Sequence, residues 1–101
     1  MNEFVLSKRA EADIDEIWTY IARNNREAAD RQIDRIYDRF ELLIEKFDFG
    51  ESIGELTAGL WRTRVGNYVI YYECERGAIL IRRVLHAACD VRKFFGGDQS
   101  N

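Results

Sequence analysis

Two amphipathic stripes with a very short break between them constrain this chain more than any other feature of its sequence. Apolar residues recur every three or four positions from Ala10 to Ile21 and again from Ala29 to Phe47, which is the spacing of one helix face. Ser7 stands where an N-cap belongs, and Asn24-Asn25 has turn chemistry. The pattern predicts an antiparallel helical hairpin, with Asp13 off the first stripe, that must bury both stripes against a second layer.

The second layer is predicted from the C-terminal half of the chain. A glycine-containing loop at residues 48–59, with room for one short strand, leads into three segments rich in Val, Ile, Tyr and Arg, as strands are. These predicted strands are Leu60–Val65, Tyr68–Cys74 and Ala78–His86.

An α+β fold follows from these elements and from the extended run Glu3–Leu6. We expect an N-terminal strand, then the antiparallel helical hairpin packed on a small antiparallel β-sheet (β-α-α-β-β-β), then a short C-terminal helix or tail. The length of 101 residues suits a single domain over residues 1–101.

Composition and charge narrow the function classes. Two cysteines are too few for a disulfide scaffold or a zinc site, and no apolar run approaches the roughly 20 residues of a membrane span. No glycine-rich phosphate loop, catalytic triad order or metal-ligand cluster is visible, so no metal and no cofactor are expected. The N-terminus lacks the basic and apolar regions of a signal peptide, and a cytoplasmic location is expected.

Charge is uneven along the chain, whose net charge is −3. Residues 1–59 carry 8 basic and 14 acidic residues, whereas residues 60–101 carry 7 and 4. The overall balance argues against a dedicated nonspecific nucleic-acid binder. The basic C-terminal part leaves room for a local patch.

The register of the first predicted hairpin can be worked out. A two-residue turn at Gly66-Asn67 pairs Val65 with Tyr68 and Arg62 with Tyr71. Because side chains alternate between the faces of a strand, one face is predicted to pack on the helices. Its residues are Trp61, Thr63, Val65, Tyr68, Ile70 and Tyr72.

The second face of the sheet carries the first functional hint. A two-residue turn at Arg76-Gly77 places Arg82 opposite Tyr71, and a shift of one residue would place Arg83 there instead. This face, predicted to be exposed, then collects Leu60, Arg62, Arg64, Val69, Tyr71, Glu73, Arg82, Val84 and His86. Guanidinium groups suit phosphate or carboxylate, so an anion site is one interpretation. Arginine carried for solubility and edge protection is the other.

Taken together and in order, several segments resemble the ParE branch of the ParE/RelE toxin superfamily. The matching segments run from Leu6 to Ile21, from Ala28 to Ile36, from Gly59 to Tyr72, and from Ile81 to Asp90. The resemblance covers about nine-tenths of the chain. The closing motif of the family usually reads His-Gly-Ala-Arg-Asp, and this chain has Cys89 in place of the arginine. For Cys89, a small buried apolar role is favoured over a nucleophilic one.

The resemblance implies the toxin of a type II toxin–antitoxin module, with a role in plasmid stabilisation. ParE-like toxins bind DNA gyrase and trap its cleaved DNA complex, and they catalyse no reaction of their own. The implied partners are gyrase and a ParD-like antitoxin, held in a heterotetramer or larger, without sequence-specific DNA binding by this chain. Two alternatives stay open: a RelE-like ribosome-dependent mRNA endonuclease, and a non-toxic antitoxin-binding member.

The resemblance also suggests roles for particular residues. The candidates for antitoxin binding are Arg62, Arg64, Tyr71 and Arg82. The candidates for target binding and toxicity are His86, Cys89, Asp90, Arg92, Lys93, Phe94 and Phe95. A ribonuclease would rely on Arg62, Arg64, Tyr71, Arg82 and His86 for charge and proton transfer. The acidic net charge and the absence of lysine from the predicted sheet favour the gyrase branch.

Overall fold

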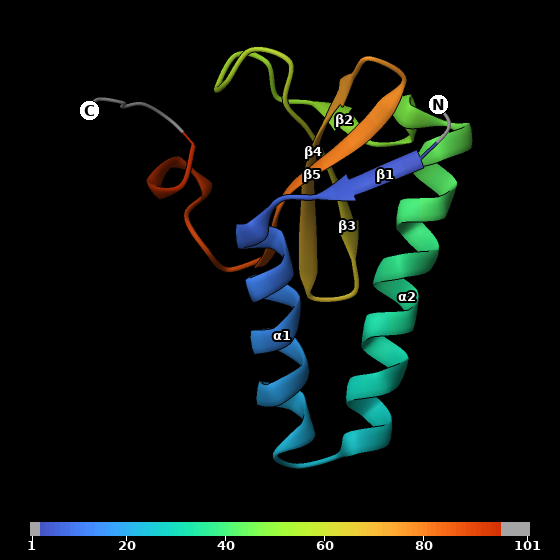
Figure 1. Cartoon of the computed structure of the whole chain (residues 1–101). Helices are drawn as coiled ribbons and strands as arrows, with labels where there is room; N and C mark the ends of the chain where they lie inside the picture. The colour runs from blue at the N-terminus through green and yellow to red at the C-terminus, as the bar shows by residue number, and fades with distance from the viewer. Residues whose placement is uncertain (1–2, 96–101) are drawn as a thin grey trace.

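The computed structural model describes residues 3–95, and residues 1–2 and 96–101, which include the end of the expected C-terminal tail, lie outside this part. Figure 1 shows a helical hairpin running alongside a sheet. The elements are β1 (Glu3–Leu6), α1 (Lys8–Ala22), α2 (Arg26–Glu45), β2 (Glu51–Ser52), β3 (Trp61–Val65), β4 (Tyr68–Glu75) and β5 (Ala78–His86), with 3₁₀ turns at Phe47–Phe49 and Val91–Lys93. No helix in the described ranges is long and apolar enough to cross a membrane.

Both helices begin at a side-chain cap: Ser7, as the sequence predicts, and Asn25, which lies in the predicted turn. The Ser7 Oγ accepts the backbone N–H of Ala10 at 3.0 Å, and the Asn25 Oδ1 accepts that of Ala28 at 3.0 Å. Each bond satisfies an N–H of the first turn that has no partner inside the helix. The hairpin of α1 and α2 is therefore confirmed.

The sheet has five strands in the order β1-β5-β4-β3-β2, and β1 runs parallel to β5. The predicted N-terminal strand is confirmed, as is a short strand in the loop, β2. The predicted antiparallel meander is confirmed in β3, β4 and β5, and β1, whose pairing was not predicted, joins it in parallel. Parallel and antiparallel pairing share the same two-residue side-chain period, so the pattern of Glu3–Leu6 predicts a strand but not its direction.

Both predicted hairpin turns are present. Val65 pairs with Tyr68 and Arg62 with Tyr71, as predicted, across a turn in which Gly66 has a φ of +62°. In the second turn Arg76 and Gly77 have φ values of +52° and +83°. Positive φ at both central residues is the pattern of a type I′ turn, whose twist matches that of the flanking strands.

A β-bulge changes the register beyond the second turn. Tyr72 pairs with Ile81 but Tyr71 pairs with Arg83, so Arg82 is the extra residue. The prediction that Arg82 lies opposite Tyr71 is therefore wrong, although the two-residue turn is right. An extra residue reverses the face of every position after it, and this disruption leaves no mark in an alternating pattern.

The bulge moves two predicted members off the second face of the sheet. Val84 is buried in the core beneath the helices, and the ring of His86 packs against Tyr68 on that same side. Leu85, which stands between Val84 and His86 in the sequence, points to the other face and lies in the cluster there. Val84 and His86 were thus assigned to the wrong face.

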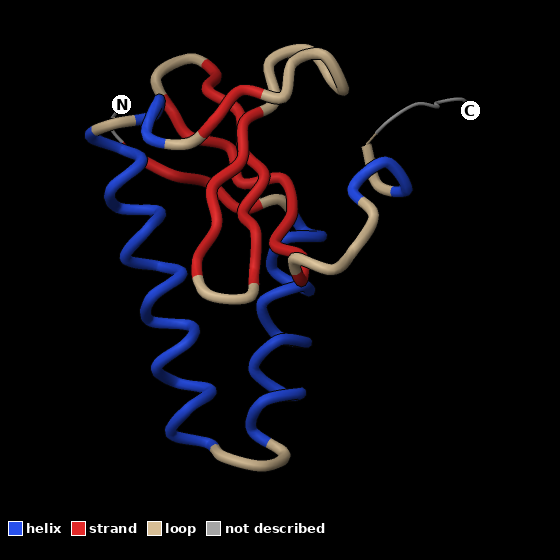
Figure 2. The backbone as a smooth tube through the Cα atoms, turned by 180° about the vertical axis from the view of Figure 1, so that it is seen from behind, coloured by secondary structure: helices blue, strands red, loops and turns tan. Residues whose placement is uncertain are grey.

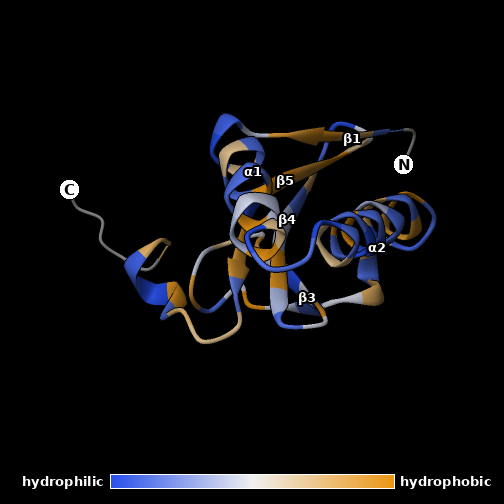
Figure 3. Ribbon diagram, turned by 90° about the horizontal axis from the view of Figure 1, so that it is seen from below, coloured by the Kyte–Doolittle hydropathy of each residue, from blue (hydrophilic) through white to orange (hydrophobic). Residues whose placement is uncertain are grey.

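Apolar side chains fill both sides of the sheet. The β3–β4 hairpin lies between the two helices in Figures 1 and 2, and Figure 3 shows hydrophobic residues of β4 and β5 beside α1 and α2. The helix-side core includes Ile14, Ile36, Phe40, Leu43, Val65, Tyr68, Ile70, Tyr72, Ile79, Ile81 and Val84. The smaller cluster on the other side is formed by Ile53, Leu60, Tyr71 and Leu85, with Leu56, Val69, Val91 and Phe95 packed against it.

Tyr72 joins the helix-side core to the loop after α2. Its ring is fully buried, while its hydroxyl donates to the carbonyl of Phe47 at 2.5 Å and accepts the N–H of Gly50 at 3.2 Å. A Cβ at Gly50 would come within 2.3 Å of the Arg62 carbonyl oxygen, so only glycine allows this close approach. Burial raises the pKa of Tyr72 to about 12.

We predict that Tyr72→Phe lowers the free energy of unfolding near neutral pH by about 1–2 kcal/mol, because two backbone groups lose their partner. The substitution should also weaken the decrease in the free energy of unfolding that occurs above pH 10. The folded-state pKa of about 12 lies above the usual 10.0, so the stability that Tyr72 contributes is full below pH 10 and is lost between pH 10 and 12. Urea midpoints across this range test both effects, and an unchanged alkaline slope in the variant would contradict the assignment.

Candidate functional site

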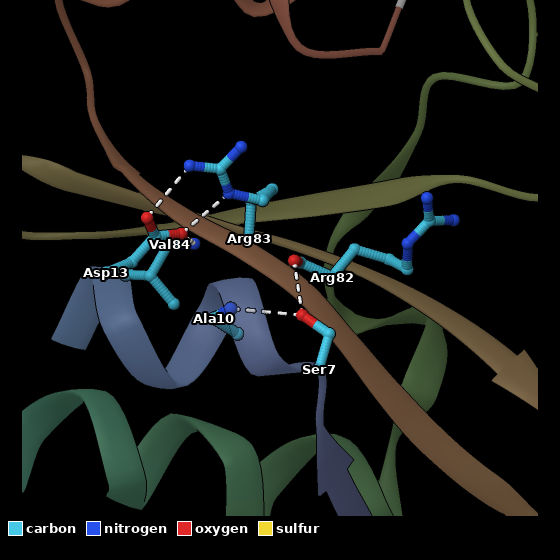
Figure 4. Close-up of polar contacts among 6 residues, drawn as sticks. All are labelled: Ser7, Ala10, Asp13, Arg82, Arg83 and Val84. Carbon is cyan, nitrogen blue, oxygen red and sulfur yellow. Dashed lines mark hydrogen bonds and ion pairs between the residues drawn. The ribbon is translucent and has the colours of Figure 1, made fainter.

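A buried ion pair joins α1 to the bulge of β5 (Figure 4). The carboxylate of Asp13 accepts the Nε and Nη2 of Arg83 at 2.8 and 2.9 Å, and the backbone N–H of Val84 at 2.9 Å. The side chains of Arg83 and Asp13 are only 13% and 9% exposed. Hydrogen bonding to Asp13 raises the pKa of Arg83. The sequence prediction placed Asp13 off the apolar stripe, yet the structure buries it against the sheet.

Ser7 holds the neighbouring part of β5. Besides capping α1, its hydroxyl donates to the carbonyl of Arg82 at 2.8 Å, and its N–H donates to the carbonyl of Ile81 at 3.0 Å. In Figure 4 the side chain of Arg83 extends toward Asp13 and that of Arg82 extends away from it. The bulge therefore presents two consecutive arginines in different directions.

Arg82 lies on the face of the sheet away from the helices, as the sequence predicted. It forms an ion pair with Glu73, and its guanidinium stacks over the ring of Phe95 at 5.7 Å. The ring of Phe95 also packs on Tyr71, with the ring centroids 5.2 Å apart. The C-terminal segment is thus anchored to the sheet through an arginine and a tyrosine that both face it.

The predicted exposure of this face is wrong at its centre. Tyr71 is only 5% exposed, because Leu60, Phe95 and their neighbours cover it. Burial raises the pKa of its hydroxyl, and the nearby Arg62 opposes that change only in part. The sequence prediction treated the strands as an isolated surface and did not include the loop and tail that fold over them.

Arg62 and Arg64 occupy the accessible border of this face. They line a cavity of about 360 Å³ together with Tyr71, Cys89 and other residues. The Nε of Arg62 lies 3.0 Å from a carboxylate oxygen of Glu51, and the Nε of Arg64 donates to the carbonyl of Gly66 at 2.8 Å. Both guanidinium groups keep donors for a further acidic partner.

His86 stands apart from these residues because the bulge turns it to the helix side. Its Nδ1 accepts the backbone N–H of Ala88 at 3.0 Å, and its ring packs edge-on against Tyr68. The five residues considered for a ribonuclease are therefore divided between the two faces of the sheet. His86 and Tyr71 do not share one reaction site.

The segment after β5 carries the remaining candidate residues. Cys89 is exposed, which contradicts the expectation of a buried apolar role. The carboxylate of Asp90 accepts the N–H of Arg92 at 3.1 Å and contacts its guanidinium, and these bonds lower the pKa of Asp90. Lys93 and Phe94 are exposed, and the ring of Phe94 lies 4.7 Å from the guanidinium of Arg83.

These placements group some predicted residues and separate others. Phe95 contacts both Arg82 and Tyr71, whereas His86 and Val84 lie on the opposite side of the sheet. Within residues 3–95 no group of three or more His, Cys, Asp or Glu side chains gathers as a metal site would require.

Sequence reasoning missed Asp13. Asp13 is a single acid at the margin of an apolar stripe, and only its partner in the folded structure, Arg83, reveals that it is buried.

We predict that Phe95→Ala loosens the C-terminal segment without unfolding the sheet. The backbone N–H groups of Phe94 and Phe95 donate to the carbonyl of Val91 at 2.9 and 3.1 Å, and their protection depends on the segment staying docked. Removal of the ring that packs on Tyr71 should speed their hydrogen exchange at least about tenfold and leave the core strands protected.

The matched control is Phe49→Ala, which removes another phenyl ring that an arginine stacks on. It should leave exchange at residues 94 and 95 unchanged. Equal acceleration in both variants would show that Phe95 has no specific anchoring role.

Comparison with known proteins agrees with this architecture. The family described as ParE toxin of type II toxin-antitoxin system, parDE, matches residues 4–91. Toxin ParE1 of Caulobacter vibrioides is 32% identical over 97 residues, which cover 95% of this chain and 100% of that protein. A chain of the solved chromosomal ParDE TA system from P. aeruginosa shares the fold, with a TM-score of 0.71, 18% identity, and coverage of 85% of this chain and 95% of that chain. The match of the family over most of the sequence, and of the relative over nearly all of it, establishes that this chain belongs to the ParE toxin family of type II toxin–antitoxin systems.

Proposed function

We propose that this ParE-family toxin inhibits DNA gyrase by binding the enzyme and trapping its cleaved DNA complex, and that a ParD-like antitoxin neutralises it. Family membership supports a toxin, and the ParE branch supports gyrase as the target. In this proposal the chain acts by binding, in the cytoplasm, where gyrase works, and it requires no cofactor.

The observation that carries the proposal is the separation of the groups that RNA cleavage would need. Such a reaction needs one group to accept the 2′-hydroxyl proton, another to protonate the leaving oxygen, and cations for the charge that develops. Tyr71 is buried with a raised pKa, and His86 lies on the other side of the sheet. Arg62 and Arg82 each have a carboxylate partner. A binding inhibitor needs no such convergence.

The segment from Cys89 to Phe95 is our candidate for the gyrase contact. It projects beside the start of α1 (Figure 1), and it presents exposed groups of several kinds: the thiol of Cys89, the cations of Arg92 and Lys93, and the ring of Phe94. Mixed aromatic and cationic surfaces are typical of protein interfaces.

The antitoxin is proposed to lay a disordered tail across the border of the sheet, where Arg62 and Arg64 are accessible. Acidic residues of that tail would pair with these guanidinium groups, whereas Tyr71 and Arg82 would contact it only at their exposed edges. We propose that toxin and antitoxin form a heterotetramer or a larger assembly.

A non-toxic, antitoxin-binding member of the family is the second candidate. The observation that favours it is Cys89, an exposed thiol where the family usually carries an arginine. The loss of that cation would weaken a contact made by the C-terminal segment while leaving Arg62 and Arg64 in place for the antitoxin.

The test is a cleavage assay with purified gyrase and supercoiled plasmid. We predict that the toxin causes linear DNA to accumulate after the enzyme is denatured, and that the cognate antitoxin abolishes this effect. Phe94→Ala should reduce cleavage at least about tenfold, because it removes an exposed contact, whereas His86→Gln should change it less than about threefold. An mRNA endonuclease would show the reverse order in a ribosome-dependent cleavage assay.

Induction in a bacterial host with a DNA-damage reporter separates the remaining candidates. Growth arrest with reporter induction supports gyrase poisoning, and arrest with an immediate stop in translation contradicts it. A folded protein that causes no arrest would favour the non-toxic member, and Cys89→Arg would then be expected to restore toxicity.

A further inference from the structure

A strongly cationic pocket opens at the start of α1. Its volume is about 520 Å³, and it is lined by Ser7, Lys8, Arg9, Arg82, Arg83, Lys93, Phe94 and Phe95. Five of these eight side chains are basic and none is acidic, on a chain whose net charge is −3. Such a local concentration of one charge, contributed by three separate segments, needs a physical reason.

The five cations are not equivalent. Arg83 is paired with Asp13, and Arg82 is paired with Glu73. By contrast, Lys8, Arg9 and Lys93 form no ion pair within 4.0 Å among residues 3–95, and all three are exposed. The fold therefore brings three cations together at this pocket, and none of them is neutralised by an acidic side chain of residues 3–95.

The position of Lys8 and Arg9 is itself unfavourable for folding. They are the first two residues of a 15-residue helix, where the positive end of the helix dipole favours anions. Ser7 satisfies the N–H of Ala10, but the backbone N–H groups of Lys8 and Arg9 have no acceptor among the described residues. A bound anion would offset the repulsion and accept from these groups at once.

Phosphate fits this pocket better than carboxylate. Free backbone N–H groups at a helix start, together with ammonium groups that act as point charges, are typical of phosphate sites. The carboxylates that the fold supplies nearby, Asp13 and Glu73, are already used by the two arginines. Because the free cations come from two segments, α1 and the turn at Val91–Lys93, they suit successive phosphates of a polymer.

We propose that this pocket binds the sugar–phosphate backbone of DNA, without reading its sequence, while the toxin is engaged with gyrase. The inference rests on the proposed function, since gyrase supplies the DNA. The net charge of −3 makes binding to free DNA weak, and attachment to gyrase raises the effective DNA concentration at the pocket.

The test is an NMR titration of the full chain with a short DNA duplex at low salt. We expect the shifts to concentrate on residues 7–9, 82–83 and 93–95. The variant Lys8→Gln/Arg9→Gln/Lys93→Gln should bind at least about tenfold more weakly, and the slope of log affinity against log salt should fall by about 2–3. The side chains are exposed, so the fold should persist.

The matched control is Arg31→Gln/Arg35→Gln/Lys46→Gln, which makes the same change in net charge at exposed positions outside the pocket. It should weaken binding less than about threefold. Equal losses in the two variants would overturn the proposal, because they would reflect net charge alone. Tighter binding of poly-glutamate than of DNA would overturn it in favour of an acidic peptide, and equally tight binding of pyrophosphate would overturn it in favour of a small anion.

The gyrase cleavage assay, run in parallel, separates this inference from the proposed function. If DNA shifts map to the pocket but the toxin does not poison gyrase, the pocket stands and the gyrase proposal fails. If the toxin poisons gyrase and the pocket variant retains full DNA affinity, the gyrase proposal stands and the pocket assignment is wrong.

Discussion

The rest of the structure depends on the buried pairing of Asp13 with the bulge of β5. The carboxylate of Asp13 accepts hydrogen bonds from the Nε and Nη2 of Arg83 and from the backbone N–H of Val84, at distances of 2.8–2.9 Å. Because both side chains are largely buried, either charge alone would be unfavourable, so the pair holds α1 at a defined position on the sheet. The same bulge turns His86 and Val84 toward the helices and leaves Arg82 on the opposite face.

Sequence reasoning succeeded where local chemistry decides the outcome. The cap at Ser7 and the turns at Asn24-Asn25 and Gly66-Asn67 follow from side-chain hydrogen bonding and from backbone freedom, and each is present. It failed where tertiary partners decide. The alternating pattern of the strands does not indicate the bulge at Arg82, nor that Leu60 and Phe95 cover Tyr71.

The candidate site follows the same division. Arg62 and Arg64 could be placed on one face from the hairpin register alone. His86 could not, because it lies beyond the bulge, and its removal from that face separates the groups that a ribonuclease would bring together. The structure instead presents three surfaces suited to binding. They are the border of the sheet with Arg62 and Arg64, the aromatic and cationic C-terminal segment, and the cationic pocket at the start of α1. These surfaces are what supports our proposal that the toxin acts by binding.

The most direct test of this account is a double-mutant cycle in which Asp13→Ala, Arg83→Ala and the double variant are compared by urea unfolding. If the pair holds α1 on the bulge, the two residues should be coupled by about 2–3 kcal/mol. The double variant would then lose far less stability than the sum of the single losses. Additive losses, with a coupling energy near zero, would contradict the central role given to this interaction.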